Sequence, residues 1–354
     1  MAIRGPRRLS NAPIVGLIAS RNATPALEKT VASLLNAGAD KVIVVDDGSD
    51  TTLAREVFDR IEATHGSRVR VIHLLVNGGK AAALRVGFAE ISPNSIIMQT
   101  DDDTLAGIDL RAPARWIIEG RADIIDVRVE VIPTGSLIGW AQELDYWAIN
   151  TIVKRLQNWI RARTWMSGAS VMYSYAAGKE LILPQAHSMT EDTEGLFRAH
   201  GKGFRVRFYA SKATQFYTMV PETLPDIRKQ WKRWATGNAQ VLARHGLGSK
   251  RPHVVFSNVM SWLQTLMFTP IITAVLSGVL PTLEWMFASG VIIGIIGAIA
   301  RRRWPLALMG WTLPIATTIW AYHAVEGIFL AWQRSRSGET SLTWTPPERT
   351  SIAA

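Results

Sequence analysis

Residues 41–49 read KVIVVDDGS and residues 95–104 read SIIMQTDDDT, so two short apolar runs each end in a cluster of carboxylates. Short apolar runs bounded by turn-forming residues are typical of buried strands in a parallel sheet. In such sheets, ligands bind in the crevice outside the carboxyl ends of the strands. We therefore expect both acidic clusters to face one crevice.

Strand and helix patterns alternate around these two stretches. The alternation predicts an α/β fold with a mostly parallel, Rossmann-like sheet. The predicted strands are residues 13–19, 41–45, 69–75 and 95–99, and the predicted helices are residues 24–37, 53–65 and 79–89. Further along, the pattern predicts a strand at 123–131, an amphipathic helix or helix pair at 138–165, and a helix at 219–243.

The composition excludes several classes of site. The chain has 354 residues and no cysteine, which excludes disulfides, thiolate catalysis and cysteine-ligated zinc. Its seven histidines show no paired metal-binding spacing. The formal net charge of +10 suits either nucleic acid or an anionic membrane. Because strongly apolar segments follow, we expect a membrane and no nucleic-acid partner.

The chain becomes strongly apolar after Lys250. Residues 254–280 are long enough to cross a bilayer, and residues 283–300 form a shorter apolar run. Arginines collect on the cytoplasmic side of membranes, so the cluster at 301–303 predicts a helical hairpin that returns to the cytoplasm. The preceding domain then faces the cytoplasm too. A third apolar run at 305–332 is interrupted by Pro314 and contains Glu326, and its topology is left open.

The aspartate triplet at 101–103 is a strong chemical signal. Two carboxylates on alternate residues at a strand end can converge on a hard cation such as Mg²⁺ or Mn²⁺. Helix N-capping by Asp103 or Thr104 is the alternative. The segment at 46–49 is less specific, because a carboxylate there can bind a base or ribose, or can simply close an ordinary turn.

Two polar clusters in the second half of the domain precede or lie on predicted helices. The sequence TED at 190–192 precedes a helical pattern, where a carboxylate can act as a general base and Thr190 can instead cap the helix. Gln230, Arg233 and Trp234 share one helix face because they are spaced i, i+3 and i+4. An indole can stack on a sugar ring and an arginine can bind phosphate. An amphipathic helix at a membrane surface explains the same pattern.

Seven segments occur together in the order of a known family. The chain resembles the family 2 glycosyltransferases, in the membrane-bound branch with the cellulose, chitin and hyaluronan synthases. The resemblance covers residues 13–234 by motif and the later apolar runs by layout. Its segments are IASRN (18–22), VVDDGSD (44–50), NGGKAAAL (77–84), QTDDDT (99–104), SGAS (167–170), TEDTEGLFRAHGKG (190–203) and QWKRW (230–234).

The resemblance implies a GT-A fold and a membrane-bound inverting transferase. Such an enzyme moves a sugar from a nucleotide-sugar, expected to be UDP-linked, to a hydroxyl acceptor. Asp192 would be the general base, and Asp101 and Asp103 would hold Mg²⁺ or Mn²⁺. The implied donor-binding residues are Ala19, Arg21, Asp47, Lys80, Asp101 and Asp102. The residues implied for the acceptor or the diphosphate are Glu191, Gln230, Arg233 and Trp234.

The resemblance also implies an organisation and a set of partners. The segments would be a basic N-terminal arm at 1–11, a GT-A domain with interfacial helices at 12–250, a transmembrane region at 251–333 and a cytoplasmic tail at 334–354. The protein is then expected in the cell or inner membrane, with its catalytic domain in the cytoplasm. Its expected partners are the donor, a glycan, lipid or protein hydroxyl, membrane lipids and a second copy of the chain.

Three functional outcomes stay open at this point. The sequence differs from the large synthases because no apolar span precedes the catalytic domain and only two to four follow it. A complete secretion channel in one subunit is therefore not expected. The product can be a β-linked polysaccharide or glycan chain, as the resemblance implies. It can equally be a single transfer to a polyprenyl phosphate or a protein, without processivity. The alternative from another class is a membrane-anchored binding module with an inactive site.

Overall fold

The computed structural model describes residues 12–163, 165–245, 252, 254–256, 259, 274 and 277–337. The predicted basic arm at 1–11, most of the apolar run at 254–280 and the tail beyond residue 337 lie outside the described residues. The predictions made for those segments therefore stay predictions.

A seven-stranded sheet forms the centre of the domain, in the order β3-β2-β1-β4-β8-β6-β9. Four of its six strand pairs are parallel, and only β8 runs antiparallel to its two neighbours. The prediction of a mostly parallel sheet is confirmed. The strands are β1 (Ile14–Ser20), β2 (Lys41–Asp46), β3 (Val69–His73), β4 (Ile96–Thr100), β6 (Ile124–Val127), β8 (Val171–Ser174) and β9 (Val206–Tyr209).

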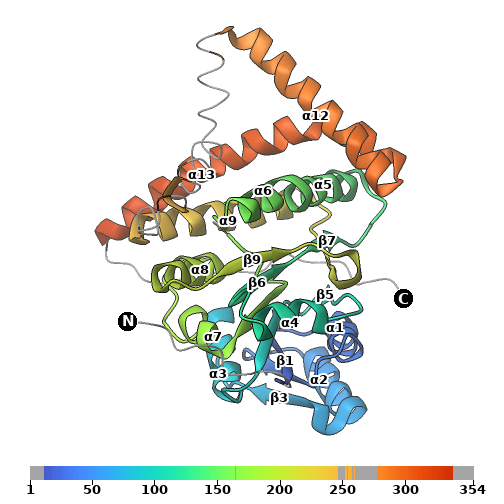
Figure 1. Ribbon diagram of the computed structural model, residues 1–354, viewed down its shortest axis with the longest axis vertical. Helices are drawn as coiled ribbons and strands as arrows, with labels where there is room; N and C mark the ends of the chain where they lie inside the picture. Colours follow the sequence, from blue (N-terminus) through green and yellow to red (C-terminus); the bar gives the residue numbers. More distant parts are fainter. Residues whose placement is uncertain are drawn as a thin grey trace.

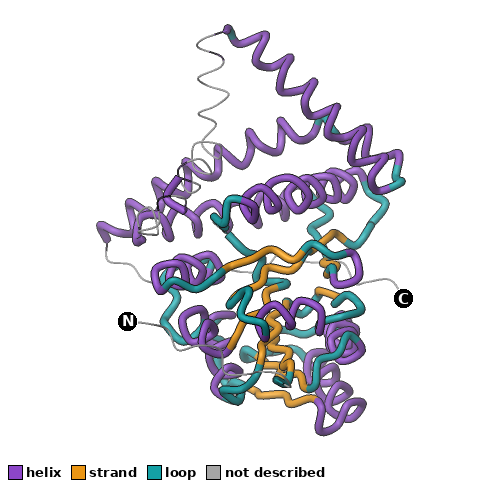
Figure 2. Tube along the Cα trace, in the orientation of Figure 1, coloured by secondary structure: helices purple, strands orange, loops and turns teal. Residues whose placement is uncertain are grey.

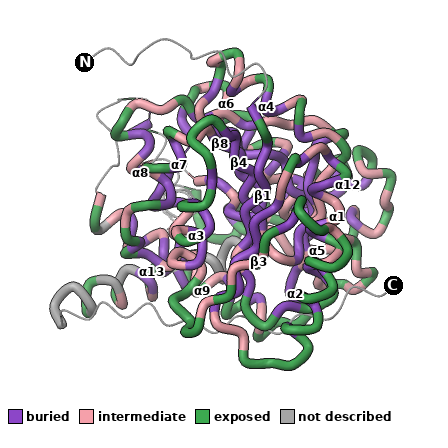
Figure 3. Tube along the Cα trace, turned by 90° about the horizontal axis from the view of Figure 1, so that it is seen from below, coloured by how far each residue is buried: buried purple, intermediate pink, exposed green. Residues whose placement is uncertain are grey.

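Alternating side chains of the central strands feed two separate cores, one on each face of the sheet. Ile14 and Ile18 of β1 pack with helices α1 and α2, whereas Val15 and Leu17 pack with α3, α7 and α8. This is the period-2 pattern that a sheet covered on both faces requires. Figure 1 shows the layers, and Figure 3 shows the buried strands ringed by more exposed helices. The helices are α1 (Pro25–Asn36), α2 (Thr52–His65), α3 (Lys80–Ala89), α4 (Arg111–Ile118), α7 (Tyr175–Leu181) and α8 (Glu191–Lys202).

A second, three-stranded sheet corrects two predictions. It is ordered β5-β10-β7 and consists of β5 (Thr104–Leu105), β10 (Phe216–Thr218) and β7 (Val129–Val131). The strand predicted at 123–131 is therefore two strands, β6 and β7, in different sheets. They divide at Arg128, whose peptide N–H donates to Tyr209 and whose carbonyl accepts from Phe216. Because Thr104 begins strand β5, helix N-capping by Asp103 or Thr104 is wrong.

Long helices cover the end of the domain opposite to α2 and β3, as Figures 1 and 2 show. The amphipathic segment predicted to reach residue 165 ends at Trp159, and Arg161 then adopts a left-handed φ of 57° that turns the chain into a loop. Helix α13 lies along α9, and a Cβ on Gly327 would come within 2.7 Å of the Thr236 Cα. The helices are α5 (Leu137–Ala148), a π-helical turn (Ile149–Val153), α6 (Lys154–Trp159), α9 (Leu224–His245), α12 (Val279–Arg301) and α13 (Thr312–Ser337).

Among the described residues, one helix is long and apolar enough to cross a membrane. It is α12, which has 23 residues. At 1.5 Å per residue it spans about 35 Å, against about 30 Å for a hydrocarbon core. Its C-terminal end returns to the α/β domain, where Arg301 and the following Arg303 each lie 3.3 Å from the buried Glu143 carboxylate. The arginine cluster and the domain therefore lie together, and the predicted membrane topology stays a prediction.

The third apolar run is not one continuous helix. It contains a 3₁₀ segment (Trp304–Met309) followed by α13, so the break falls near Gly310 and Pro314 lies in the first turn of a helix. Proline is tolerated there because the first turn needs no intrahelical N–H donor. Gly290 permits the break to pack closely, since a Cβ on it would lie 2.4 Å from the Gly310 carbonyl oxygen.

Candidate active site

The carboxyl ends of β2 and β1 meet the glycine segment that begins α3. The Asp47 carboxylate accepts a 2.8 Å hydrogen bond from the Gly78 N–H. Gly48 between the strand and this contact has a φ of +67°, and a Cβ on it would lie 2.6 Å from the Asn77 nitrogen. Only glycine fits that close approach. The predicted donor residues Asp47 and Lys80 are thus brought to one edge of the sheet.

The end of β1 joins the same edge. Ala19 pairs in register with Val45 of β2, and the Arg21 guanidinium lies 3.3 Å from the Asp50 carboxylate. The next residue, Asn22, donates its N–H to the Ser49 hydroxyl at 2.8 Å. Ala19 and Arg21 therefore lie beside the loop after β2, where the sequence predicted a nucleotide.

The three aspartates after β4 have three different environments. The Asp101 carboxylate lies 2.5 Å from the Lys80 ammonium. The Asp102 carboxylate accepts a 2.7 Å hydrogen bond from the Ser20 hydroxyl, so Asp102 ties β4 to β1. Asp103 is buried at the start of the small sheet, where the Thr104 hydroxyl donates to it at 3.3 Å. This arrangement distinguishes Asp102, one of the implied donor-binding residues, from its two neighbours.

Lys80 links the aspartate cluster to the TED sequence. Its ammonium lies between Asp101 and Glu191, which is 3.5 Å away. Burial opposes the charge of Lys80, but the attraction of Asp101 and Glu191 outweighs it and raises the pKa of Lys80. Lys80 therefore stays protonated and presents a fixed positive charge at the centre of the site.

Asp192 lies in the first turn of α8 with both carboxylate oxygens held. One accepts the Gly168 N–H at 2.9 Å, and the other accepts the Thr193 N–H at 2.7 Å. Burial and the neighbouring Glu191 charge raise the pKa of Asp192 to about 6, against the opposing pull of Lys80. A carboxylate with a pKa near the working pH can accept a proton during catalysis.

The start of α8 is not capped by Thr190, so that prediction is wrong. The Thr190 hydroxyl lies 3.0 Å from the Ser188 hydroxyl and makes no cap hydrogen bond to α8. The segment is instead fixed on α9, because the Ser188 hydroxyl donates to the Gly237 carbonyl at 2.8 Å. A Cβ on Gly237 would lie 2.6 Å from the Thr190 side chain.

Helix α9 brings Arg233, one of the predicted acceptor residues, to this side of the site. Arg233 is half-buried, and its charge helps to lower the pKa of Asp192 against the larger effect of burial. Gln230 is buried and Trp234 is half-buried. Lys232 has a separate role, since its ammonium lies 2.6 Å from Glu326 of α13. This contact gives Glu326, which the sequence left without a role, an ionic partner.

Gly168 is a site residue to which the sequence assigned no role. A Cβ there would lie 3.0 Å from an Asp192 oxygen and 3.3 Å from the Lys80 nitrogen. The SGAS sequence was a visible signal, but its spacing alone pointed to no partner. Tyr146 of α5 was also missed, and burial followed by the Asp145 and Asp101 charges raises the pKa of its hydroxyl. It resembled an ordinary residue of an amphipathic helix.

Protein side chains alone do not build a complete metal site in the part of the chain that the structure describes. No group of three or more His, Asp or Glu residues there is arranged to hold an ion. Asp101 and Asp103, the predicted ligands, each carry a hard carboxylate. Proteins commonly bind Mg²⁺ through one or two carboxylates together with substrate phosphates.

The family of the domain follows from comparison with known proteins. Residues 17–180 match the family model described as glycosyl transferase family 2. These residues are a family 2 glycosyltransferase domain. They include the donor-side residues Asp47, Lys80 and Asp101, and the matched region ends before the TED sequence. The predicted family is confirmed.

Curated relatives of this glycosyltransferase are polysaccharide synthases. The chain is 26% identical over 237 residues to the poly-beta-1,6-N-acetyl-D-glucosamine synthase of Staphylococcus aureus (strain COL), covering 65% of this chain and 56% of that protein. It is 27% identical over 234 residues to the synthase of the same name from Staphylococcus epidermidis (strain ATCC 35984), covering 64% and 55%. The chain thus spans little more than half the length of these relatives.

The fold also has a solved counterpart. The mannosyltransferase PcManGT from Pyrobaculum calidifontis, in complex with GDP-Man and Mn²⁺, matches 86% of this chain and 88% of its own length, with a TM-score of 0.58. The two sequences are 15% identical, so this similarity concerns the fold alone. The glycosyltransferase domain has the predicted GT-A-like α/β fold with a mostly parallel sheet.

Proposed function

We propose that this glycosyltransferase is a membrane-bound, inverting enzyme that transfers a sugar from a UDP-linked donor to a hydroxyl acceptor. The observation that carries the proposal is the convergence of Lys80, Asp101 and Glu191 next to Asp192. A fixed cation, a carboxylate that can share in binding a metal and a carboxyl group with a raised pKa are parts that such a reaction needs.

Asp192 is the proposed general base. In a single displacement, the acceptor oxygen attacks the anomeric carbon as the bond to the leaving diphosphate breaks, and Asp192 takes the hydroxyl proton. The product linkage is then β from an α-linked donor. The pKa of about 6 supports this role, because the carboxylate is ionised at neutral pH and is still a useful proton acceptor.

The donor is assigned to the edge formed by β1, β2 and α3. Asp47 would bind the uracil, with Ala19 and Arg21 beside it, and Lys80 would contact the diphosphate. The contact between Asp47 and Gly78 supports this arrangement, since it sets the base and phosphate positions on adjoining loops. In the chain without donor, the carboxylates of Asp101 and Glu191 neutralise the Lys80 charge.

A divalent metal is assigned to Asp101 and Asp103. Asp101 and Asp103 would hold Mg²⁺ or Mn²⁺, and Asp102 is engaged by Ser20. When bound, the ion stabilises the negative charge on the departing diphosphate. The fit rests on hard oxygen donors, which both cations accept, so the two metals are not distinguished.

The acceptor is assigned to the side of the site formed by α8 and α9. Glu191, Gln230, Arg233 and Trp234 would bind the acceptor or the diphosphate. Exposed apolar side chains of α12, among them Ile292 and Ile295, support insertion into a membrane with the catalytic domain in the cytoplasm. Because the curated relatives make a polysaccharide, we favour a β-linked glycan as the product.

The test is the release of UDP from a panel of UDP-sugars by the purified chain in detergent, with Mg²⁺ or Mn²⁺. Metal-dependent release from one donor is expected, and Asp192→Asn and Asp103→Ala are each expected to abolish it. Asp59→Asn, which changes an exposed carboxylate on α2, is the control and should retain release. Absence of both release and donor binding across UDP-, GDP- and dTDP-sugars would refute the proposal. Product length on a glycan primer then distinguishes a polymer from a single transfer.

A further inference from the structure

The loop that precedes β8 fixes the carboxylate of Asp192. We call residues 165–170 the SGAS loop. Its Gly168 N–H donates to Asp192 at 2.9 Å, and the space beside Gly168 is too small for a Cβ without crowding that carboxylate. Any displacement of the SGAS loop therefore displaces Asp192 or breaks its hydrogen bond.

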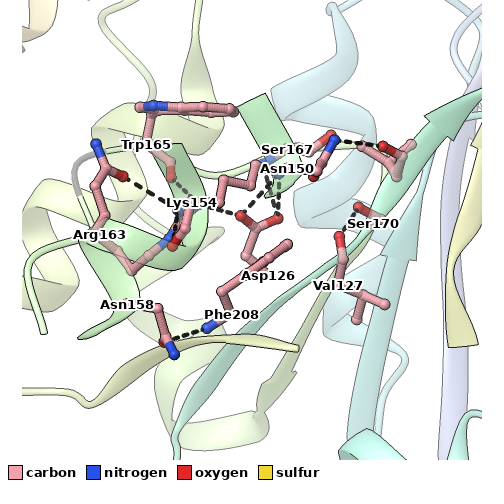
Figure 4. Close-up of polar contacts among 12 residues, drawn as sticks. Asp126, Val127, Asn150, Lys154, Asn158, Arg163, Trp165, Ser167, Ser170 and Phe208 are labelled. Carbon is pink, nitrogen blue, oxygen red and sulfur yellow. Dashed lines mark hydrogen bonds and ion pairs between the residues drawn. The ribbon is translucent and has the colours of Figure 1, made fainter. Parts of the chain in front are cut away.

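A cluster of charged side chains lies directly behind this loop, and the proposed reaction does not use it. Asp126 of β6 lies 3.1 Å from the Lys154 ammonium and also forms an ion pair with Arg163, as Figure 4 shows. The three side chains are at most 1% exposed. We call them the buried ionic cluster. Burial, only partly offset by Asp126, lowers the pKa of Lys154 to about 8.

The buried ionic cluster is bonded to the SGAS loop at two points. Asp126 accepts the N–H of Ser167, the residue next to Gly168, at 3.4 Å. Arg163 donates to the Trp165 carbonyl at 2.8 Å. The Trp165 ring also covers the Lys154 ammonium, which lies 4.8 Å from its centroid. These contacts come from β6, from α6 and from Arg163 just before the loop, so the loop has little freedom to shift alone.

The same cluster holds the far end of α8. His200, in the last turn of that helix, donates through Nε2 to the Arg163 carbonyl at 2.6 Å, and its side chain is buried. Helix α8 is therefore fixed twice to one stretch of chain: at Asp192 through Gly168, and at His200 through Arg163.

Buried charges are costly, and apolar residues of similar volume fill a core at least as well. Here the cluster is bonded to the SGAS loop, whose Gly168 holds Asp192, and it includes Arg163, whose carbonyl holds His200. We propose that Asp126, Lys154, Arg163 and His200 are positioning residues, which hold the SGAS loop and α8 so that Gly168 directs the Asp192 carboxylate toward the acceptor. This inference rests on the proposed role of Asp192 as the base.

The variants Asp126→Asn and His200→Phe test the inference through kinetics. Each should lower kcat on the order of 10-fold to 100-fold, the effect of a small displacement of a reacting group, while the KM for the donor stays within about twofold. Loss of the Gly168 hydrogen bond favours protonated Asp192, so the acid limb of the kcat–pH profile should move to higher pH. The charges of Glu191, Lys80 and Arg233 remain as in the parent.

The matched control is Asp123→Asn. Asp123 directly precedes the same strand β6 but forms its ion pair with Arg205, outside the buried ionic cluster. The Asp123→Asn variant should leave kcat and the pH profile of kcat unchanged. A parent-like kcat and acid limb in both positioning variants would overturn the inference. If Asp126→Asn does not fold, His200→Phe decides, because it leaves the three charged side chains of the buried ionic cluster unchanged.

Hydrogen–deuterium exchange gives a readout that does not depend on activity. Both variants should accelerate exchange in peptides covering residues 165–170 and 190–195, whereas Asp123→Asn should not. Parent-like exchange in both segments would overturn the inference even if no donor were ever found. Inactivity of the parent toward every donor would instead refute the proposed function, so the two failures are distinguishable.

Discussion

At the scale of the residue, Asp192 is balanced between two protonation states. Burial and Glu191 favour the neutral acid, while Lys80 and the Thr193 N–H favour the carboxylate. The balance raises its pKa to about 6 from an ordinary value of 3.8. A base in this range should titrate within the activity profile. We expect kcat for UDP-sugar transfer to rise as pH increases through about 6, measured at saturating donor and metal. A flat profile between pH 5 and 8 would contradict the proposed role of Asp192.

The same shift predicts that ionised Asp192 makes the folded protein less stable. Because its pKa is raised on folding, the protonated group contributes stability that is full below pH 4 and is lost as pH rises through 6. Asp192→Asn should therefore be as stable as the parent near pH 4 and more stable at pH 8. The expected gain in the free energy of unfolding is about 1–3 kcal/mol. Thermal unfolding at both pH values measures it, with Asp59→Asn as a control that should gain nothing. Equal stability of Asp192→Asn and parent at pH 8 would count against the raised pKa.

At the scale of the element, the contact of α9 with the loop before α8 sets where the TED sequence lies. Gly237→Ala would place a Cβ 2.6 Å from the Thr190 side chain and 2.8 Å from its nitrogen. Overpacking of this kind costs about 1–3 kcal/mol. We expect lower stability together with a reduced kcat, because the start of α8 must move. Urea unfolding and UDP release measure the two effects.

The control for this change is a glycine on the neighbouring helix, Gly201 of α8. A Cβ on Gly201 meets nothing within 4 Å, so Gly201→Ala should stabilise the helix by about 0.5–1 kcal/mol and leave kcat unchanged. If both glycine variants behaved alike, close packing at residue 237 would not be the cause.

Elements differ in how far the sequence predicted them. Strands β1, β2 and β4 were predicted to within a residue or two, because an uninterrupted apolar run ending in polar residues has few alternatives. The break between β6 and β7 was missed because Arg128 and Glu130 neutralise each other in the interior, and no turn residue marks the crossing.

The carboxylates at strand ends were found because they lie next to strong apolar strand patterns in the sequence. The contact of Gly168 with Asp192 joins residues 24 apart and depends on tertiary packing, which local patterns do not encode.

At the scale of the whole molecule, buried ion pairs join the apolar helix α12 to the catalytic domain. Glu143 of α5 is 1% exposed and lies 3.3 Å from both Arg301 and Arg303. Glu143→Gln removes the buried carboxylate that both arginines face, while Arg301 keeps Glu130 at 3.8 Å. The variant should lower the free energy of unfolding by about 1–3 kcal/mol, measured by thermal unfolding in detergent.

An exposed carboxylate gives the comparison. Glu119 forms a 3.3 Å pair with Arg121, and both side chains are more than half exposed. Glu119→Gln should change stability by no more than about 0.5 kcal/mol. Similar losses in the two variants would mean that the α12 contact is no stronger than a surface pair.

The pairing of α9 with α13 has a consequence for biosynthesis. Lys232 and Glu326, which join the two helices, are 94 residues apart in the chain. At about 5–20 residues per second, a ribosome needs roughly 5–20 s to make the intervening segment. During that interval the face of α9 around Thr236 has been made, while the helix that covers it has not. The nascent domain therefore passes through a stage in which α9 lacks its cover, and this stage ends only when α13 has been synthesised.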